Sequence, residues 1–369
     1  MTDSKRAGNS SLRSKLWGIK PAVIEMRANG RSGPDSGTVQ RAMRNVLLKV
    51  IPLYVFFSSA FCAAAERVMI ATPSQGLVEL PVVVAMRNGY FRTEGLEVQK
   101  IQIQPEIAVK ALVAGEVDYV LAWGTSVQAA MTGAPIKVVA AMVSRPLHIL
   151  ISRPEIRFGR DLKGKPLGVD SFGSRVDYLS RVAVRYLGLD PDRDVKIIDM
   201  GESLLRVTAL KDGSIDATAV DAALAVKAEE EGLKRFLHLG DIIDLPISGI
   251  AVTAAKLATH REQIKKVIQA TLRGARFIKQ KRPETIRIIQ SHLRITHSQA
   301  TKTYDSSIRS FADDGFVSER AVSLDVRRAK EELQLATDPS LSQVADWSLV
   351  REIKLERSKI PYWLKNDEP

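Results

Sequence analysis

One short pattern occurs twice in this chain and constrains its fold more than any other feature. The two segments are "AGEVDYVLA", residues 114–122, and "DGSIDATAV", residues 212–220. Each contains glycine, a β-branched residue, aspartate and then small or apolar residues. Glycine commonly ends a helix, and a short apolar run after it is typical of a buried strand. The pattern therefore predicts the same helix-to-strand junction at two points of the chain.

The order of elements before each copy is also the same. The first copy follows a strand over 67–71, a polar loop, a helix from Leu80, a second strand and a helix over 106–113. The second copy follows a strand over 167–169, a polar loop, an amphipathic helix, a strand and a helix. Chance is the alternative explanation, because short glycine-containing junctions are common, but the shared order favours a repeat. Alternating strands and helices predict an α/β protein in which each lobe has a mainly parallel sheet with flanking helices.

The chain after residue 244 has a different pattern. The segment "LPISGIAVTAA" predicts one more strand, and the remainder predicts a helical C-terminal tail. Thr259 with Glu262, and Thr296 with Gln299, have capping-box spacing at two helix starts. We expect the tail to pack on the first lobe. The domain prediction is therefore a discontinuous lobe 1, residues 66–147 and 248–369, and a continuous lobe 2, residues 148–247.

The N-terminal part has the layout of an export signal. Basic residues precede an apolar stretch over 50–62, and alanines at 63–65 supply a cleavage position, which predicts a signal peptide over 43–65. Residues 1–42 are interpreted as a disordered tail or a mis-assigned translation start. Cys62 is the single cysteine, and a lipid anchor there is disfavoured because the bulky Phe61 precedes it. The predicted localisation is periplasmic.

The net charge of +12 does not indicate a nucleic-acid partner. Residues 1–65 contain ten Lys or Arg against three Asp or Glu, so this leader accounts for +7. The rest of the chain carries +5, which is a mild excess, and its charges of both signs are mixed, as on a solvated helix surface.

The sequence offers no support for catalysis. None of the five histidines has HExxH spacing, and motifs of the GxSxG, GxxxxGK[ST] and GxGxxG kinds do not occur. His148 and His238 fall in predicted strands, where a structural role is the simpler interpretation. With no cysteine after residue 62, thiolate metal sites and a cysteine nucleophile are excluded from the mature chain. We therefore predict no catalytic residue, no metal and no cofactor.

The candidate binding residues lie in loops that follow predicted strands, where open α/β sheets place their ligands. Several of these loops are rich in Gly, Ser or Thr and lead into a helix, whose free N–H groups favour an anion. The predicted ligand-binding residues are Ser74, Gln75, Gly76, Trp123, Thr125, Ser126, Arg145, Ser171, Gly173, Ser174 and Asp221.

Each of the more prominent candidates also has a structural interpretation. Ser174, next to Gly173, is the strongest candidate for anion binding, and an ordinary helix cap is the alternative. Trp123 is a candidate platform for the apolar part of a ligand, or a core residue. Asp221 either meets a cationic group or ties down a loop. Arg145 either pairs with an anion or lies in a solvated crossover.

Taken together, several segments resemble one known family. The segments "NGYFRTEGLEV", "ALVAGEVDYVLA", "DLKGKPLGV", "GS" at 173–174 and "LKDGSIDA" are similar to the sulfonate, taurine and nitrate-type substrate-binding proteins of bacterial ABC transporters. The wider group includes proteins resembling thiamine-pyrimidine synthases. The resemblance covers approximately residues 68–276. Phe172 and Arg175 flank the Gly-Ser pair in place of the usual small polar residues, so the motifs do not identify the ligand.

The resemblance implies a two-lobed periplasmic-binding-protein-like fold of type II. It also implies that two crossover strands, near 144–153 and 245–252, act as a hinge on which the lobes close around a solute. The expected partners are a small, anionic organic solute of the sulfonate, carboxylate or nitrate type and an ABC permease in the inner membrane. The expected state is a monomer. The alternative is a cytosolic enzyme on the same fold, of the pyrimidine-synthase or menaquinone-pathway dehydratase kind.

Overall fold

The computed structural model describes residues 65–337 and 339–359, and every structural statement below refers to these residues. The predicted leader over 1–42, the signal peptide over 43–65 and Cys62 therefore lie outside the described residues, except for Ala65.

The first sheet combines four strands from the N-terminal part of the described chain with one strand that follows the second sheet in sequence. It consists of β1 (Glu66–Thr72), β2 (Leu96–Gln102), β3 (Tyr119–Val120), β4 (Ile136–Val143) and β10 (Ser248–Thr253), in the order β2-β1-β3-β10-β4. Strand β1 pairs in parallel with β2 and β3, whereas β10 is antiparallel to β3 and β4. We call the body around this sheet lobe 1.

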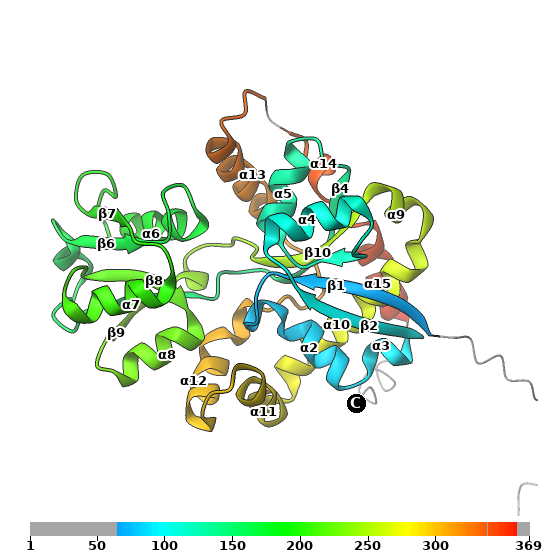
Figure 1. Ribbon diagram of the computed structural model, residues 1–369, viewed down its shortest axis with the longest axis horizontal. Coiled ribbons are helices and arrows are strands. Elements are labelled where there is room, and N and C mark those ends of the chain that lie inside the picture. The colour runs from blue at the N-terminus through cyan, green and yellow to red at the C-terminus, as the bar shows by residue number, and fades with distance from the viewer. Residues whose placement is uncertain (1–64, 338, 360–369) are drawn as a thin grey trace, which may run out of the picture. The chain divides into compact units, whose positions relative to one another are not determined.

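The second sheet repeats this arrangement with the strands that lie between β4 and β10 in the sequence. It consists of β5 (His148–Ser152), β6 (Pro166–Val169), β7 (Lys196–Asp199), β8 (Ala217–Asp221) and β9 (Lys234–His238), in the order β7-β6-β8-β5-β9. Strand β6 is parallel to β7 and β8, and β5 is antiparallel to β8 and β9. The body around it is lobe 2, drawn in green in Figure 1.

The helices of both lobes begin where the sequence pattern expects them, with one difference. Lobe 1 has η1 (Leu77–Glu79), α2 (Leu80–Arg87), α3 (Tyr90–Thr93), α4 (Pro105–Ala114) and α5 (Trp123–Met131). Helix α5 begins directly after Ala122, so Trp123, Thr125 and Ser126, which the sequence pattern places in a loop, lie in the first turn of a helix.

Lobe 2 has a comparable set of helices. They are η2 (Gly159–Leu162), α6 (Arg175–Tyr186), α7 (Ser203–Asp212), α8 (Ala222–Glu230) and η3 (Leu239–Asp241). Ser174 caps α6 and Asp221 caps α8, each through a side-chain oxygen that accepts backbone N–H groups.

The repeated sequence pattern occupies the same position in each lobe. Gly115 ends α4 and Gly213 ends α7, and both adopt positive φ, of 78° and 84°, which glycine tolerates best. Asp118 and Asp216 then stand just before β3 and β8, the central strands of the two sheets. The prediction of two βαβ lobes with mainly parallel sheets is confirmed.

The C-terminal part is helical, as predicted. It contains α9 (Ala254–Thr259), α10 (Arg261–Gln280), α11 (Arg282–Leu293), α12 (His297–Ser307), η4 (Ile308–Ser310), α13 (Glu319–Leu333), α14 (Leu341–Val344) and α15 (Ser348–Lys359). The capping box of Thr296 and Gln299 is present at the start of α12. The one expected at Thr259 is not formed, because α9 extends to that residue and His260 takes the cap position of α10.

The tail does not pack on lobe 1 alone. Helices α10 and α15 contact lobe 1 elements, but α12 packs against α8 of lobe 2. One apolar core contains Leu80 of α2, Tyr304 of α12, and Ala225 of α8, so it extends from lobe 1 through the tail into lobe 2. Local helical periodicity shows that a helix has a buried face, but it does not show which lobe covers that face.

The chain passes between the lobes twice, over residues 144–147 and 242–247, which connect β4 to β5 and η3 to β10. Figure 1 shows these two connections running side by side between the green and cyan bodies. Within 65–337 and 339–359, no helix has both the length and the apolar character needed to cross a membrane.

Candidate functional site

A cavity of about 500 Å³ lies where the two lobes meet, and we call it the interlobe cavity. Lobe 1 contributes the loop after β1, and lobe 2 contributes the starts of β5, α7 and α8. Leu293 at the end of α11 and Ile295, two residues further on, complete the wall. The lining residues are Ser74, Gln75, Gly76, Leu77, Val78, Leu147, His148, Ser203, Leu204, Asp221, Ala223, Leu224, Lys227, Leu293 and Ile295.

Four of the predicted binding residues line this cavity. Ser74, Gln75 and Gly76 come from lobe 1, and Asp221 comes from lobe 2. The side chain of Gln75 also donates to the backbone carbonyl of His292, at 2.7 Å, which ties the loop to α11. The structure thus brings together residues that are almost 150 positions apart in the sequence.

Asp221 stands at the end of β8 and at the start of α8. Its Oδ1 accepts the backbone N–H groups of Ala223 (2.9 Å) and Leu224 (3.1 Å). These are donors that the start of a helix otherwise leaves free, so the carboxylate occupies the position an anionic ligand would seek there. A cationic or hydrogen-bond-donating group of a solute is the better partner for this exposed side chain.

His148 lies opposite Asp221 in the register of β5 and β8, and it also lines the cavity. Its Nδ1 is buried and has no hydrogen-bond partner in the described part of the chain. Burial lowers the pKa of His148 to about 4, with nearby Asp221 opposing and Arg175 reinforcing the shift. The imidazole is therefore neutral near pH 7, and it can accept or donate one hydrogen bond to a solute.

The start of α6, our strongest sequence-based candidate for anion binding, is filled by carboxylates of the protein itself. The N–H of Ser171 donates to Asp170 Oδ1 at 2.9 Å, and the N–H of Gly173 donates to Asp177 Oδ2 at 2.9 Å. The hydroxyl of Ser174 donates to Asp170 and accepts the N–H of Asp177 at 3.1 Å. In this structure Gly173 and Ser174 take part in the cap of α6, Ser171 contacts the neighbouring Asp170 through its N–H, and none of the three lines the interlobe cavity.

The three candidates on α5 lie in different surroundings. Trp123 is fully buried, and its indole N–H donates to Asp325 at 2.8 Å. The hydroxyl of Ser126 is buried and lacks a partner among the described residues. Thr125 lines a separate, outer pocket between α4, α5 and the end of α13. The structure therefore does not bring these residues to the interlobe cavity.

Arg145 lies in the first crossover and pairs with Asp244 in the second. The Nε of Arg145 is 2.8 Å from Oδ1 of Asp244, and both side chains are largely exposed. The pair joins the two connections between the lobes, which agrees with the crossover interpretation of this residue.

Sequence reasoning missed two residues at the meeting point of the lobes. The sequence favours a structural role for His148, and its position at the start of a predicted strand is the only signal that points to the site. The sequence shows Arg175 as an unusual neighbour of the Gly-Ser pair, but it gives no reason to place this residue in the site. Its partner, Asp325, lies on the distant helix α13, where no local pattern links the two residues.

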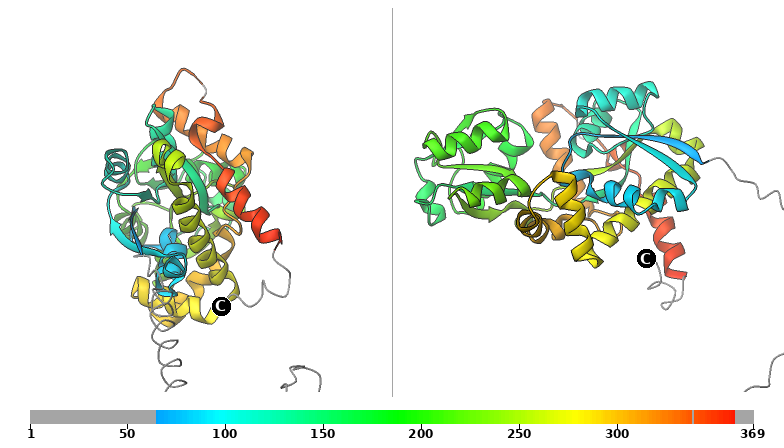
Figure 2. Two further views of the ribbon diagram at one scale, coloured as in Figure 1. Left: turned by 90° about the vertical axis from the view of Figure 1, so that its right-hand side faces the viewer. Right: turned by 60° about the horizontal axis from the view of Figure 1, so that its bottom comes forward.

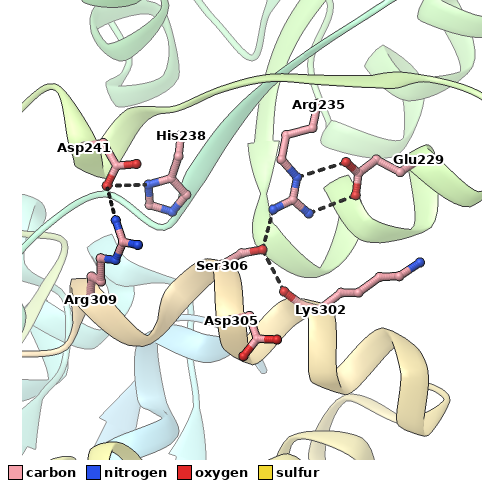
Figure 3. A pocket seen from close by; sticks show the side chains of 8 residues that line it. All are labelled: Glu229, Arg235, His238, Asp241, Lys302, Asp305, Ser306 and Arg309. Atoms are coloured by element: carbon pink, nitrogen blue, oxygen red, sulfur yellow. Dashed lines mark hydrogen bonds and ion pairs between the residues drawn. The ribbon is translucent and has the colours of Figure 1, made fainter.

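A second charged pocket, of about 430 Å³, lies between lobe 2 and α12 (Figure 3). Its charged groups largely satisfy one another: Arg235 pairs with Glu229 at 2.9 Å, and Arg309 and His238 both approach Asp241 at 3.8 Å. Arg235 also donates to the hydroxyl of Ser306 on α12. We therefore assign this pocket to the contact between lobe 2 and the tail.

The described residues include no cluster of three or more His, Cys, Asp or Glu side chains suited to a metal ion.

Solved structures with the same architecture define the fold class. The periplasmic aliphatic sulphonate-binding protein SsuA from Escherichia coli has a TM-score of 0.65 at 16% identity, over 76% of this chain and 92% of that chain. The periplasmic nitrate-binding protein NrtA from Synechocystis PCC 6803 has a TM-score of 0.59 at 13% identity, over 81% and 91%. The chain has a two-lobed periplasmic-binding-protein-like fold, as expected.

A family model and a curated relative extend the comparison to the sequence. The model described as NMT1/THI5 like matches residues 78–286, more than half of the chain, and this protein therefore belongs to the NMT1/THI5-like family. A riboflavin-binding protein, RibY, from Chloroflexus aurantiacus is 26% identical over 204 residues, 53% of this chain. This chain matches 57% of the length of that relative. The resemblance that the sequence indicated is confirmed at the level of fold and family.

Proposed function

We propose that this protein is the periplasmic solute-binding receptor of an ABC importer. One observation carries the proposal: the loop over 74–76 of lobe 1 and His148, Ser203 and Asp221 of lobe 2 line the same cavity of about 500 Å³. Small-molecule sites are commonly clefts of about 300–1,000 Å³ that combine apolar walls with a few placed polar groups. The similarity in fold to SsuA and NrtA, which are sulphonate- and nitrate-binding proteins, supports this class of function.

The proposed solute is a small organic molecule with an anionic group and an apolar body. Lys227 supplies a positive charge at the cavity, while Leu204 and Leu224 contribute apolar surface on the lobe 2 side. Leu204 is 66% exposed, although it is a large apolar residue, so covering it with a solute removes apolar area from water. His148 and Asp221 then fix the orientation of the polar groups.

Bending at the two crossovers, residues 144–147 and 242–247, would open the lobes to admit a solute and close them again around it. A ligand favours the closed form only through contacts that it makes better in that form, and groups from both lobes line the cavity. The pair of Arg145 and Asp244 would couple the two connections during this motion.

The assignment to the periplasm, the ABC permease as partner, the monomeric state and the lobe bounds of 66–147 with 248–369 and 148–247 are parts of the same proposal. The predicted signal peptide supports export, and the solved neighbours are mostly binding proteins. For that reason we propose a receptor and no catalytic activity.

A thermal-shift screen of the chain from residue 66 tests the proposal. The screen contains sulfonates, carboxylates, nitrate, pyrimidines and riboflavin, and each hit is confirmed by calorimetry. A true ligand at a hundredfold excess over Kd stabilises the folded state by about 2.7 kcal/mol.

Two variants locate the binding site. Lys227→Gln and Asp221→Asn should weaken a confirmed ligand, and Asn retains the ability to cap α8. Lys196→Gln, an exposed change on the edge strand β7 of lobe 2, is the matched control. A ligand whose affinity is the same in all three variants does not bind in the interlobe cavity. A screen that gives no hit in any class of compound contradicts the proposal.

A further inference from the structure

Arg175 belongs to lobe 2, but its side chain ends among groups from outside that lobe. It is the first residue of α6. Its Nη1 donates to the backbone carbonyl of Pro246 in the second crossover, at 2.8 Å. Its Nη2 lies 3.7 Å from Oδ1 of Asp325 on α13, and the guanidinium lies against Gly124 in the first turn of α5. The side chain is only 20% exposed.

Asp325, the acceptor of this contact, is held in place by lobe 1 and α13. Its carboxylate is fully buried, and it accepts hydrogen bonds from the indole of Trp123 (2.8 Å) and from Nε of Arg328 (2.9 Å). Arg328 also bonds to Glu332, at 2.5 Å. The orientation of the Asp325 carboxylate is therefore fixed by groups other than Arg175. Among these partners of the carboxylate, Arg175 is the one that belongs to lobe 2.

The charges of this group balance. Asp325 and Glu332 are negative, and Arg175 and Arg328 are positive. Burial lowers the pKa of the Arg175 guanidinium, and the charge of Asp325 opposes this effect. Because a charge-assisted contact in a buried position is screened less than a surface pair, separating Arg175 from Asp325 is costly.

An apolar contact accompanies the ion pair. Leu324, the neighbour of Asp325 on α13, packs against the lobe 2 core that contains Val176 and Leu179 of α6. The right-hand view in Figure 2 shows the orange helix, α13, between the green and the cyan bodies. The two lobes are thus joined on this side by both a polar and an apolar contact.

We propose that Arg175 is a latch that holds the lobes closed in the absence of solute, by occupying the space between the first turns of α5 and α6 and pairing with Asp325. Arg175 does not line the interlobe cavity, so that cavity stays available for solute. The contact between Arg175 and Asp325 sets the ratio of open to closed molecules. The inference goes beyond the proposed function, which it uses only in taking the open form as the one that admits solute.

Single-molecule energy transfer without any solute tests the latch. The chain from residue 66 contains no cysteine, so Lys110→Cys on α4 of lobe 1 and Lys196→Cys on β7 of lobe 2 provide two exposed labelling positions. In this solute-free protein we expect one main population of high transfer efficiency. A main population of low efficiency overturns the proposal, whatever the solute screen gives.

Three substitutions then assign the effect to Arg175. Arg175→Gln and Asp325→Asn should each raise the ratio of open to closed molecules about tenfold, because each removes the largely buried ion pair between these residues at 3.7 Å. The double variant should add little to either single change, because both remove the same contact. Arg185→Gln, an exposed change at the other end of α6, is the matched control and should leave the distribution unchanged.

The outcome is decided by comparison with that control. If Arg175→Gln folds, as judged by circular dichroism, and its distribution matches that of Arg185→Gln, the latch is excluded. If Arg175→Gln does not fold, Asp325→Asn and the unsubstituted solute-free distribution decide the question. None of these measurements needs a ligand, so a failed latch leaves the proposed receptor function to be judged by its own screen.

Discussion

His148 and Asp221 are direct cross-strand partners where β5 begins and β8 ends, and both line the interlobe cavity. The carboxylate of Asp221 is committed to the first turn of α8, whereas Nδ1 of His148 is buried without a partner in the described chain. Of the two residues, His148 therefore has the buried atom with unused hydrogen-bonding capacity, whereas the side chain of Asp221 is exposed. A solute group that reaches this nitrogen would satisfy a polar atom that the protein leaves unpaired.

Stability should fall on mild acidification because of His148. Its folded-state pKa is about 4, below the ordinary value of 6.5. Between these two values the unfolded chain binds a proton that the folded chain does not, so each pH unit removes up to about 1.4 kcal/mol of the free energy of unfolding. Above pH 6.5 the residue contributes no slope. Chemical denaturation of His148→Gln at pH 7 and pH 5 should show a smaller loss than the unsubstituted protein, whereas the exposed His297→Gln should show the same loss; equal losses in all three contradict this prediction.

Trp123→Phe should destabilise the protein by about 1–3 kcal/mol, because it leaves one lone pair of the buried carboxylate of Asp325 without its donor. Thermal unfolding followed by circular dichroism measures the effect. Trp347 stacks on Trp123 with ring centroids 6.1 Å apart, and Trp347→Phe keeps the partners of Asp325. The control should therefore cost less, and the reverse order would show that stacking and not the indole hydrogen bond is the important contact.

Gly249→Ala should be poorly tolerated, at a cost of about 1–3 kcal/mol. A Cβ at this position of β10 would lie 2.6 Å from the carbonyl oxygen of Ala140 and 2.7 Å from the ring of Trp123. Gly76→Ala places its Cβ no closer than 3.8 Å to Ser74 Oγ, so it should change the midpoint of denaturation little. Similar midpoints for both variants would mean that β10 can shift to make room.

Ser174→Ala should cost about 1 kcal/mol through loss of the helix cap. Ser171→Ala is the matched control, since Ser171 is exposed and contacts Asp170 through its backbone N–H. The same pair of variants in a calorimetric titration distinguishes capping from solute binding. If Ser174→Ala weakens a confirmed ligand without changing stability, the anion-binding interpretation of the sequence holds and the capping interpretation is displaced.

Much of the fold could be predicted because it depends on local signals. Gly115 and Gly213 end helices at positive φ, and the apolar runs after them become the central strands of the two sheets. The cap at Ser174 follows from the residue type and its place before an amphipathic face. Such signals are contained within a few positions of the chain, so a single sequence reveals them.

The site was harder to predict from the sequence, because it depends on contacts between distant parts of the chain. Trp123 was expected in a loop, yet it is buried against Asp325, about 200 residues later. Arg175 and Asp325 are 150 positions apart. No periodicity or spacing encodes such pairs, and the carboxylates that fill the start of α6 become evident only when the loop geometry is known.

Each crossover enters the interior of a sheet and not its edge. Strand β5 lies between β8 and β9, and β10 lies between β3 and β4. A strand that is hydrogen-bonded on both sides cannot move independently of its neighbours. A small torsional change in 144–147 or 242–247 would therefore rotate an entire sheet as a rigid body. Substitutions at residues 144–146 or 242–247, none of which lines the interlobe cavity, would therefore change how tightly a solute is held without contacting it.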